Sequence, residues 1–164
     1  MREITFPNLK IRIQEENDTV TYYFHGDVDE NFNQNDVPRI SKKKLVFELA
    51  EINNINSCGI REWIFFINDF KDLGHLIFRR CSVSVIDQAN MMPDSLKGGT
   101  IESFYAPYFC KCGTEANCLI EVEKNIKNLK NGVAPEFTCN ECKEPLEFDA
   151  LEESYFQFAS TLKG

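Results

Sequence analysis

Hydrophobic and polar positions alternate at the start of the chain with the period of a β-strand. Two stretches, Glu3–Ile13 and Thr19–Phe24, follow this pattern and are joined by a polar turn over residues 15–18. The next segment, from Asp29 to Ser41, is rich in asparagine and contains Pro38, so that any helix in it is short. We therefore predict two strands followed by a connection without a long helix.

The middle of the chain alternates between apolar runs and helical periods. Residues 45–50 form an apolar run typical of a strand buried on both faces. A helix is then predicted to begin at Ser57, a good N-cap type, and to end before Gly74, which stands where a C-cap belongs. Its apolar residues recur three or four positions apart: Ile60, Trp63, Ile64, Ile67 and Phe70.

Three further elements complete this region: a strand over residues 76–78, a short helix over 82–90 and a last strand over 100–105. Strands that alternate with helices imply an α/β layer with parallel strand pairing.

The composition changes after residue 106. Residues 107–148 hold two cysteine pairs and few large apolar side chains, so burial alone would hardly stabilise this lobe. Asp149 and Glu152 then stand at the spacing of an N-cap and its N3 partner, and a helical stripe follows on Leu151, Tyr155, Phe158 and Leu162. We predict an α/β domain over residues 1–106, a small lobe over 107–148, and a C-terminal helix over 149–164 that docks on the other two.

The overall composition is that of an ordinary globular protein, with 43% hydrophobic and 27% charged residues. No apolar run is long enough to span a membrane, and the N-terminus lacks the apolar core of a secretory signal. We therefore expect a cytoplasmic protein without a membrane partner. The formal net charge of −8 argues against nucleic acid as a partner, and the short run Lys42-Lys43-Lys44 is no basic footprint.

The cysteines carry the clearest chemistry. There are seven, an odd number, and in a chain without a signal this favours metal binding over disulfides. Cys139 and Cys142 have the spacing of a zinc knuckle. Cys110 and Cys112 are one residue closer together, and Gly113 after them suits a turn that points N–H groups at sulfur. Four thiolates can close a tetrahedron around a structural Zn²⁺ and supply folding energy to a lobe that lacks a core.

Alternatives to this ligand set stay open. Cys118 could replace a ligand if the short first pair cannot reach the metal, and Cys139 with Cys142 could instead be a redox dithiol. Residues 117–123 alternate like a strand, which is typical of a zinc ribbon, and Cys139 does not stand in the strand-to-helix context of a thioredoxin-like redox site. His25 and His75 lie far from the cysteines in the sequence, so a catalytic zinc with an open position is not predicted.

The remaining cysteines, Cys58 and Cys81, are expected to pack in the core. Residues 108–148 contain seven glutamates against five lysines, which makes this lobe a poor partner for nucleic acid. The chain has no Gly-rich phosphate loop, no Ser-His-Asp arrangement and no carboxylate pair at useful spacing, so we do not expect an enzyme.

A buried strand, a polar turn and a helix meet at Asn56-Ser57-Cys58-Gly59-Ile60. This order resembles the STAS domain, the module of bacterial anti-sigma factor antagonists and of sulfate-transporter tails, in which a helix begins at Asp-Ser-Ser/Thr-Gly-Leu. The turn Gly26-Asp27-Val28-Asp29 and the stretch from Gly74 to Phe78 are similar to two further family features. The resemblance spans about residues 3–105, and the cysteine-rich lobe resembles the zinc-binding extension of a subgroup of bacterial STAS proteins.

The resemblance implies a mixed β-sheet with packed helices, followed by a zinc-ribbon lobe, and a function in binding a protein partner. In the family the first serine of the motif is phosphorylated by an anti-sigma factor kinase, and Ser57 stands in its place. A phosphoserine at a helix N-terminus meets free N–H groups and the positive end of the dipole. The chain departs from the family at Asn56 and Cys58 and in the shortness of its first connection. Two hypotheses follow: Ser57 is a phospho-switch, or it is only an N-cap in a constitutive scaffold.

Overall fold

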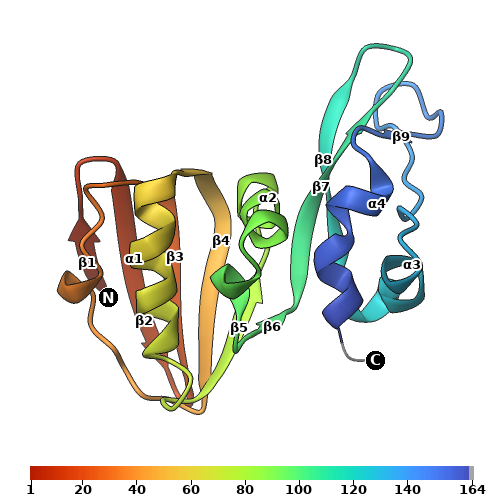
Figure 1. Cartoon of the computed structure of the whole chain (residues 1–164). Helices are drawn as coiled ribbons and strands as arrows, with labels where there is room; N and C mark the ends of the chain where they lie inside the picture. The colour runs from red at the N-terminus through yellow and green to blue at the C-terminus, as the bar shows by residue number, and fades with distance from the viewer. Residues whose placement is uncertain (163–164) are drawn as a thin grey trace.

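Two β-sheets lie side by side, with helices packed against them (Figure 1). The structure is a computed structural model that describes residues 1–162. The first sheet has six strands in chain order: β1 (Arg2–Thr5), β2 (Leu9–Glu16), β3 (Thr19–Val28), β4 (Lys44–Ile55), β5 (His75–Arg79) and β6 (Thr100–Ile101). Strands β1 to β3 pair antiparallel and β3 to β6 pair parallel, so the sheet is mixed and the predicted α/β class is confirmed.

Two helices cover one face of this sheet (Figure 1). Helix α1 (Ser57–Asn68) connects β4 to β5, and α2 (Val83–Met91) connects β5 to β6. Because each crossover joins neighbouring parallel strands and has the same hand, both helices fall on the same side. The opposite face is open, which explains why buried Ile11 and Ile13 alternate with exposed Lys10 and Arg12 along β2.

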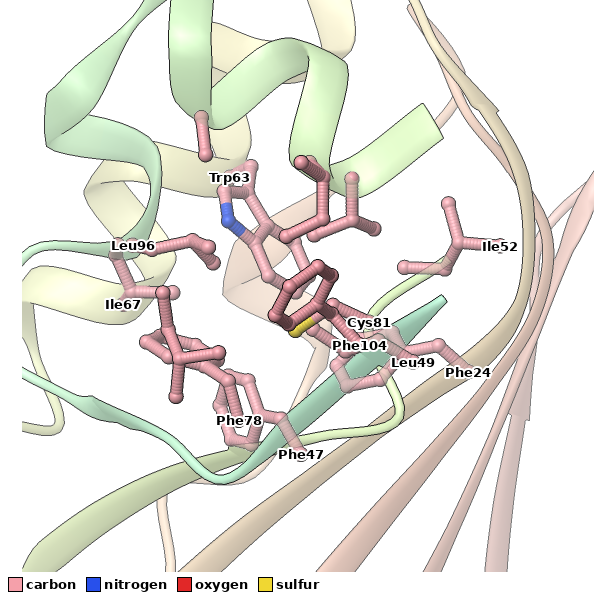
Figure 2. Close-up of a cluster of buried hydrophobic side chains, with 14 of the residues drawn as sticks. Phe24, Phe47, Leu49, Ile52, Trp63, Ile67, Phe78, Cys81, Leu96 and Phe104 are labelled. Carbon is pink, nitrogen blue, oxygen red and sulfur yellow. The ribbon is translucent and has the colours of Figure 1, made fainter. Parts of the chain in front are cut away.

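Aromatic side chains fill the space between α1 and the sheet (Figure 2). Trp63 is fully buried and lies edge-on to Phe24 of β3 and Phe47 of β4, at centroid distances of 5.2 Å and 5.9 Å. Its indole N–H donates to the carbonyl of Ser95 at 2.7 Å, in the short 3₁₀ helix η2 (Pro93–Leu96). The core therefore contains the polar end of the tryptophan without leaving its donor unpaired.

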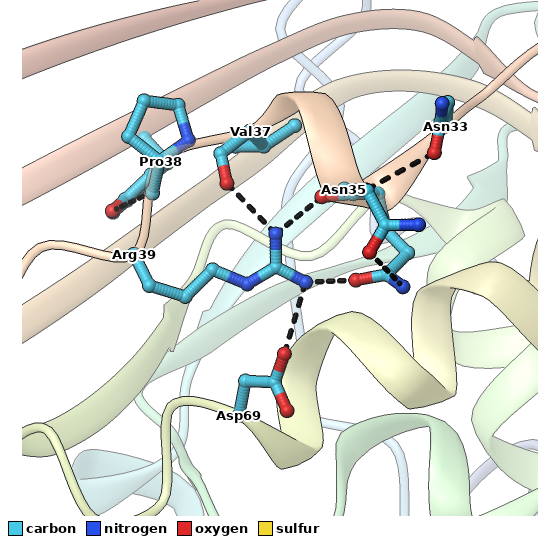
Figure 3. A network of polar contacts seen from close by, with 8 residues as sticks. Asn33, Asn35, Val37, Pro38, Arg39 and Asp69 are labelled. Atoms are coloured by element: carbon cyan, nitrogen blue, oxygen red, sulfur yellow. Dashed lines mark hydrogen bonds and ion pairs between the residues drawn. The ribbon is translucent and has the colours of Figure 1, made fainter.

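The connection from β3 to β4 contains only one 3₁₀ turn, η1 (Gln34–Asp36), as predicted from Pro38 and the asparagines. Arg39 fixes this connection to the end of α1 (Figure 3). Its guanidinium donates to the carbonyls of Gln34 and Val37, forms an ion pair with Asp69 at 3.0 Å, and lies 4.9 Å from the centre of the Phe66 ring.

Helix α1 begins at Ser57 as predicted, but the predicted N-cap and the predicted C-terminal end were wrong. The N-cap is Asn56, whose side-chain oxygen accepts from the Gly59 N–H at 2.8 Å, and Ser57 is the first helical residue. The helix ends at Asn68 with Asp69 as its C-cap in ordinary right-handed conformation, and Gly74 lies beyond a further turn. The apolar period continued to Phe70 because that residue still packs in the core after the helix has ended.

Three strand predictions were also too coarse. The stretch Glu3–Ile13 is two strands, β1 and β2, separated by a turn that contains Pro7. Strand β4 runs on to Ile55 through residues predicted to form a polar turn. The strand predicted over residues 100–105 is divided between β6 and the first strand of the second sheet, β7 (Ser103–Phe109).

The second sheet has the order β8-β7-β9, with β8 (Glu115–Glu121) and β9 (Glu147–Phe148) on either side of β7. Strand β7 runs through the boundary expected between residues 106 and 107. The Pro107 carbonyl points toward β9 and accepts from the Asp149 N–H at 2.9 Å. The N–H that proline lacks would point to the same side, so the pairing of β7 with β8 loses no hydrogen bond at Pro107. Two short helical segments follow β8: η3 (Glu123–Asn125) and α3 (Ile126–Lys130).

Strand β7 links the second sheet to the first through an isolated bridge between Phe104 and Cys81. At its start, Ser103 accepts from the Cys81 N–H at 3.0 Å and the Tyr105 N–H donates to the Cys81 carbonyl at 2.8 Å, directly after β5. Its remaining length pairs with β8 and β9. The two sheets are therefore joined through one continuous strand.

The C-terminal segment is shorter in helix than predicted. Helix α4 (Glu152–Tyr155) is followed by the 3₁₀ helix η4 (Gln157–Thr161). The N-cap is Leu151, so the predicted capping pair was wrong, and the Glu152 carboxylate accepts from the Ala134 N–H at 3.0 Å instead. Leu151, expected in the buried stripe, is 77% exposed. Residues 163–164 of the predicted helix lie outside the described residues.

Hydrogen bonds tie this segment to both lobes. Asn90 of α2 donates to the Tyr155 carbonyl at 2.8 Å and accepts from the Phe158 N–H at 2.9 Å. The Tyr155 hydroxyl donates to the Tyr105 carbonyl of β7 at 2.6 Å. Among the described residues, no helix is long and apolar enough to cross a membrane.

Candidate metal centre

The first cysteine pair lies in the tight turn between β7 and β8. The Cys110 N–H donates to the Thr114 carbonyl at 2.8 Å, and the Gly113 N–H donates back to the Cys110 carbonyl at 2.9 Å. Gly113 has φ +96°, a conformation that residues with a Cβ rarely adopt. The glycine after Cys112 thus closes a turn in which both sulfurs lie at the same end of the hairpin.

The second pair is held in a similar turn. An isolated bridge between Thr138 and Pro145 opens it, and the Cys139 N–H donates to the Glu144 carbonyl at 2.8 Å. Lys143 follows Cys142 as Gly113 follows Cys112, and it too has a positive φ, of 66°. In both turns, the residue directly after the second cysteine therefore has a positive φ.

The four sulfurs converge on one point. All four Sγ atoms lie within 4.8 Å of one another, with 3.3 Å between Cys110 and Cys142 and 3.8 Å between Cys112 and Cys139. A tetrahedral ion with metal–sulfur distances of ~2.3 Å would separate its ligands by ~3.8 Å. The observed spacing is compatible with a metal site of four thiolates, two from each turn.

Local hydrogen bonds favour the thiolate form at two of these sulfurs. The Cys142 N–H, aided by the Glu141 N–H, lowers the pKa of Cys139 to about 6 against the opposing effect of burial. The Thr114 hydroxyl, 3.1 Å from the Cys112 sulfur, and the Thr114 N–H lower the pKa of Cys112.

The pKa of Cys110 is shifted in the opposite direction. The Cys112 N–H lowers its pKa, but the hydrogen bond with the Cys142 sulfur and burial outweigh this and raise it to about 12. A cluster of four thiols cannot lose all its protons without a cation to offset the charge, which is what a divalent metal supplies. The donor set therefore fits a metal that is bound with release of protons.

A tetrahedral metal held by all four cysteines would have no position left for a catalytic water. The four ligands of the cluster are all cysteines, and neither histidine belongs to it. His25 lies in β3, where it contacts Glu51, and His75 is the first residue of β5. The geometry matches a closed structural site, which in zinc proteins has four protein ligands.

The other cysteines lie elsewhere in the fold. Cys118, the suggested substitute ligand, sits on β8 opposite Ala106 and is outside the cluster of sulfurs among the described residues. Cys81 is fully buried, and burial raises the pKa of its thiol, as expected of a core cysteine. The same prediction for Cys58 was wrong, since it lies exposed on the first turn of α1.

The residues that resemble the STAS motif surround the start of α1. Ser57 is exposed, and because Asn56 is the N-cap, its interpretation as a cap was wrong. Asn56 also donates to Glu30 at 2.9 Å, which links the helix start to the turn after β3. Asparagine caps helices as well as serine does, so the sequence signal for Asn56 was present one position earlier.

A comparison of the chain with protein-family models found no match, and a comparison with curated proteins found none. Function therefore has to be inferred from the sequence and from the geometry of these two sites.

Proposed function

We propose that the chain is a non-enzymatic regulatory module that binds a protein partner, similar to the STAS-domain anti-sigma factor antagonists. In this proposal a structural Zn²⁺ holds the C-terminal lobe, and phosphorylation of Ser57 controls the partner. The observation that carries the switch is that Ser57 is exposed on the first turn of α1 while Asn56 does the capping. The hydroxyl of Ser57 has no hydrogen-bond partner among the described residues, so a kinase can modify it without breaking the helix start.

A phosphate at this position would change the charge of the helix start. It would meet free N–H groups of the first helical turn and the positive end of the helix dipole, which stabilise it. It would also bring a charge of about −2 near the Asn56–Glu30 contact, where a carboxylate is already present. A partner that contacts this surface through acidic or apolar groups would be repelled, as a partner switch requires.

Zinc is the metal that best suits the cysteine cluster. Four thiolates in two knuckle-like turns, which fill all four positions of a tetrahedral ion, are the usual structural zinc site. Native mass spectrometry before and after chelation tests this part. One zinc per chain, with loss of structure in residues 107–148 on chelation, is expected. A metal-free chain with reactive thiols would contradict the zinc site and favour a redox pair at Cys139 and Cys142.

The switch is tested with the tagged full chain expressed in its native cell. Wild-type protein should gain the mass of one phosphate at Ser57 when incubated with the kinase that co-purifies with it. A Ser57→Ala variant should keep the regulatory partner, and Ser57→Asp should lose it. Phosphorylation elsewhere, or equal recovery of the partner by both variants, would remove Ser57 as the switch.

A second candidate is a constitutive scaffold whose STAS-like part never switches. It is favoured by Asn56, which replaces the aspartate of the family motif and is engaged by Glu30, and by Cys58, which replaces the second hydroxyl. This hypothesis predicts a stable complex of the same composition for wild type, Ser57→Ala and Ser57→Asp. The same purification therefore separates the two proposals.

A further inference from the structure

Strand β8 is an outer strand of the second sheet, and its free edge carries unpaired backbone groups. It pairs with β7 alone. The Cys110–Thr114 and Glu102–Val122 backbone bonds mark the positions at which β7 and β8 exchange hydrogen bonds. Because such positions alternate in an antiparallel pair, the N–H and C=O groups of Glu115, Asn117 and Leu119 point away from β7. No backbone hydrogen bond reaches them from the described residues.

The side chains at these positions share one face of the sheet. Glu115, Asn117, Leu119 and Glu121 are all exposed along β8, and Leu119 is 37% exposed. Directly opposite Asn117 and Leu119 on β7 are the half-buried Pro107 and Tyr105. An apolar stripe thus runs beside the free edge, on the face that is not covered by α4.

A hollow of about 390 Å³ continues the edge at the end of β8. Its lining residues come from both sheets: Leu119, Glu121, Glu123 and Lys124 from the end of β8 and the turn after it, and Arg79, Arg80, Glu102 and Ser103 from the other side. Two of its carboxylates already have partners, since Arg79 pairs with Glu102 at 2.6 Å and Lys124 pairs with Glu121 at 2.7 Å. Glu123 has no ion pair among the described residues, and neither has Glu115 at the other end of the strand.

We propose that β8 is a docking edge for an extended segment of a partner protein in which basic residues flank apolar ones. Such a segment would add a strand to the sheet, with its backbone bonded to Asn117 and Leu119 and its apolar side chains beside Leu119. Its basic ends would lie near Glu115 and, at the end of β8 beyond Glu121, near Glu123. The site is separate from the start of α1 and lies on the metal-binding lobe.

The charge pattern argues for a foreign strand over a second copy of this chain. If two β8 strands paired antiparallel over their full length, Glu115 of each would stand opposite Glu121 of the other. Like charges directly opposite one another destabilise a strand pair, so the two glutamates protect the edge against self-association. Lysine or arginine at the same places would be attracted, and the net charge of −8 adds a longer-range contribution.

The probe is a fluorescent seven-residue peptide, Lys-Thr-Val-Thr-Val-Thr-Lys, added to the metal-loaded full chain and followed by anisotropy. Its two valines would bond through their backbone to Asn117 and Leu119, and its two lysines would stand opposite Glu115 and Glu121. Saturable binding that weakens with salt is expected. N-methylation of the two valines should weaken binding by at least ~tenfold, because it removes donors that face β8, whereas N-methylation of two threonines should change it little.

Variants of the protein provide the matching test. Leu119→Pro removes an outward N–H that β7 does not use and should weaken binding about tenfold, and Leu119→Val should preserve it. Equal affinity of the two methylated peptides, equal binding when glutamate replaces both lysines, or a concentration-dependent dimer in place of peptide binding would each overturn the proposal. Ser57→Asp should bind the peptide like wild type, so failure of the phospho-switch and failure of this edge are distinguishable.

Discussion

Gly59 shows how closely one residue can control the position of α1. A Cβ atom added at Gly59 would lie 2.0 Å from the Val28 carbonyl oxygen and 2.4 Å from its carbon. The neighbouring Asn56 N–H donates to the same carbonyl at 3.1 Å, so the start of the helix is held against the end of β3 by backbone contact. A glycine in this motif is therefore a packing requirement, whatever the function of Ser57.

Replacing Gly59 with alanine should lower the free energy of unfolding by at least about 2 kcal/mol, because the helix must move away from β3 to admit the methyl group. Cys58→Ala, at an exposed neighbouring position of the same turn, is the control and should change stability by less than ~0.5 kcal/mol. Urea denaturation measures both. Equal stability of the two variants would mean that α1 can shift without cost.

At the scale of elements, Arg39 fixes the long connection between β3 and β4 to the end of α1. The guanidinium contacts two carbonyls, the Gln34 side chain, Asp69 and the Phe66 ring, and its side chain is only 19% exposed. A planar group with several donors is needed to reach these partners at once, and lysine cannot do so.

Arg39→Lys should therefore destabilise the chain by about 1–3 kcal/mol, even though the charge is kept. Asp69→Asn should cost less than ~1 kcal/mol, since Asp69 is 58% exposed and water screens the pair. Thermal unfolding of both variants measures the difference. A larger loss of stability in Asp69→Asn than in Arg39→Lys would show that the ion pair holds the connection, and not the hydrogen bonds from the guanidinium to the two carbonyls.

The elements that could be predicted were those with a strong local period. The apolar run at residues 45–50, the helical spacing around Trp63 and the cysteine pairs all carry their signal within a few positions. The errors arose where distant partners decide the structure. The polar residues Glu51, Asn53 and Asn54 lie in the continuation of β4 because β3 offers backbone partners there. Glu152 does not take its expected capping role because its carboxylate accepts from the Ala134 N–H. The clustering of the four sulfurs was predictable from spacing, but the continuous strand β7 was not, since Pro107 reads locally as a break.

At the scale of the whole molecule, the cysteine cluster and the terminal segment are the two devices that order the second lobe. Cys139→Ser should lower Zn²⁺ affinity by at least about 100-fold and unfold residues 107–148, because it removes a buried ligand. Cys118→Ser, in the same lobe but outside the cluster, should keep full metal content. Metal analysis and near-ultraviolet circular dichroism measure both, and metal loss in Cys118→Ser would restore that residue as a ligand.

The contact between the lobes should be sensitive to alkali. Burial, together with the nearby Asp87 carboxylate, raises the pKa of Tyr155 well above its ordinary value, and its hydroxyl donates to the Tyr105 carbonyl. Burial likewise raises the pKa of Tyr108. The unfolded chain loses these protons first, so stability is complete below about pH 10 and falls as the pH rises above it.

Tyr155→Phe should cost about 1–2 kcal/mol at neutral pH, because the Tyr105 carbonyl loses its donor. Its stability should nevertheless fall less steeply than that of wild type above about pH 10. Denaturation midpoints across this range measure the slope. An unchanged slope would mean that Tyr155 ionises in the folded chain as freely as in water.

The bridge between β7 and Cys81 has a consequence for how the gene can be divided. A fragment that ends at residue 102 would lack the backbone partners of Cys81. It would also leave a cavity in the core where Phe104 packs. A fragment that begins after residue 102 would keep β7 but lose the α2 side chain that holds the terminal segment. Neither fragment should fold when it is expressed alone, so the two sheets should be kept together in any truncation or fusion.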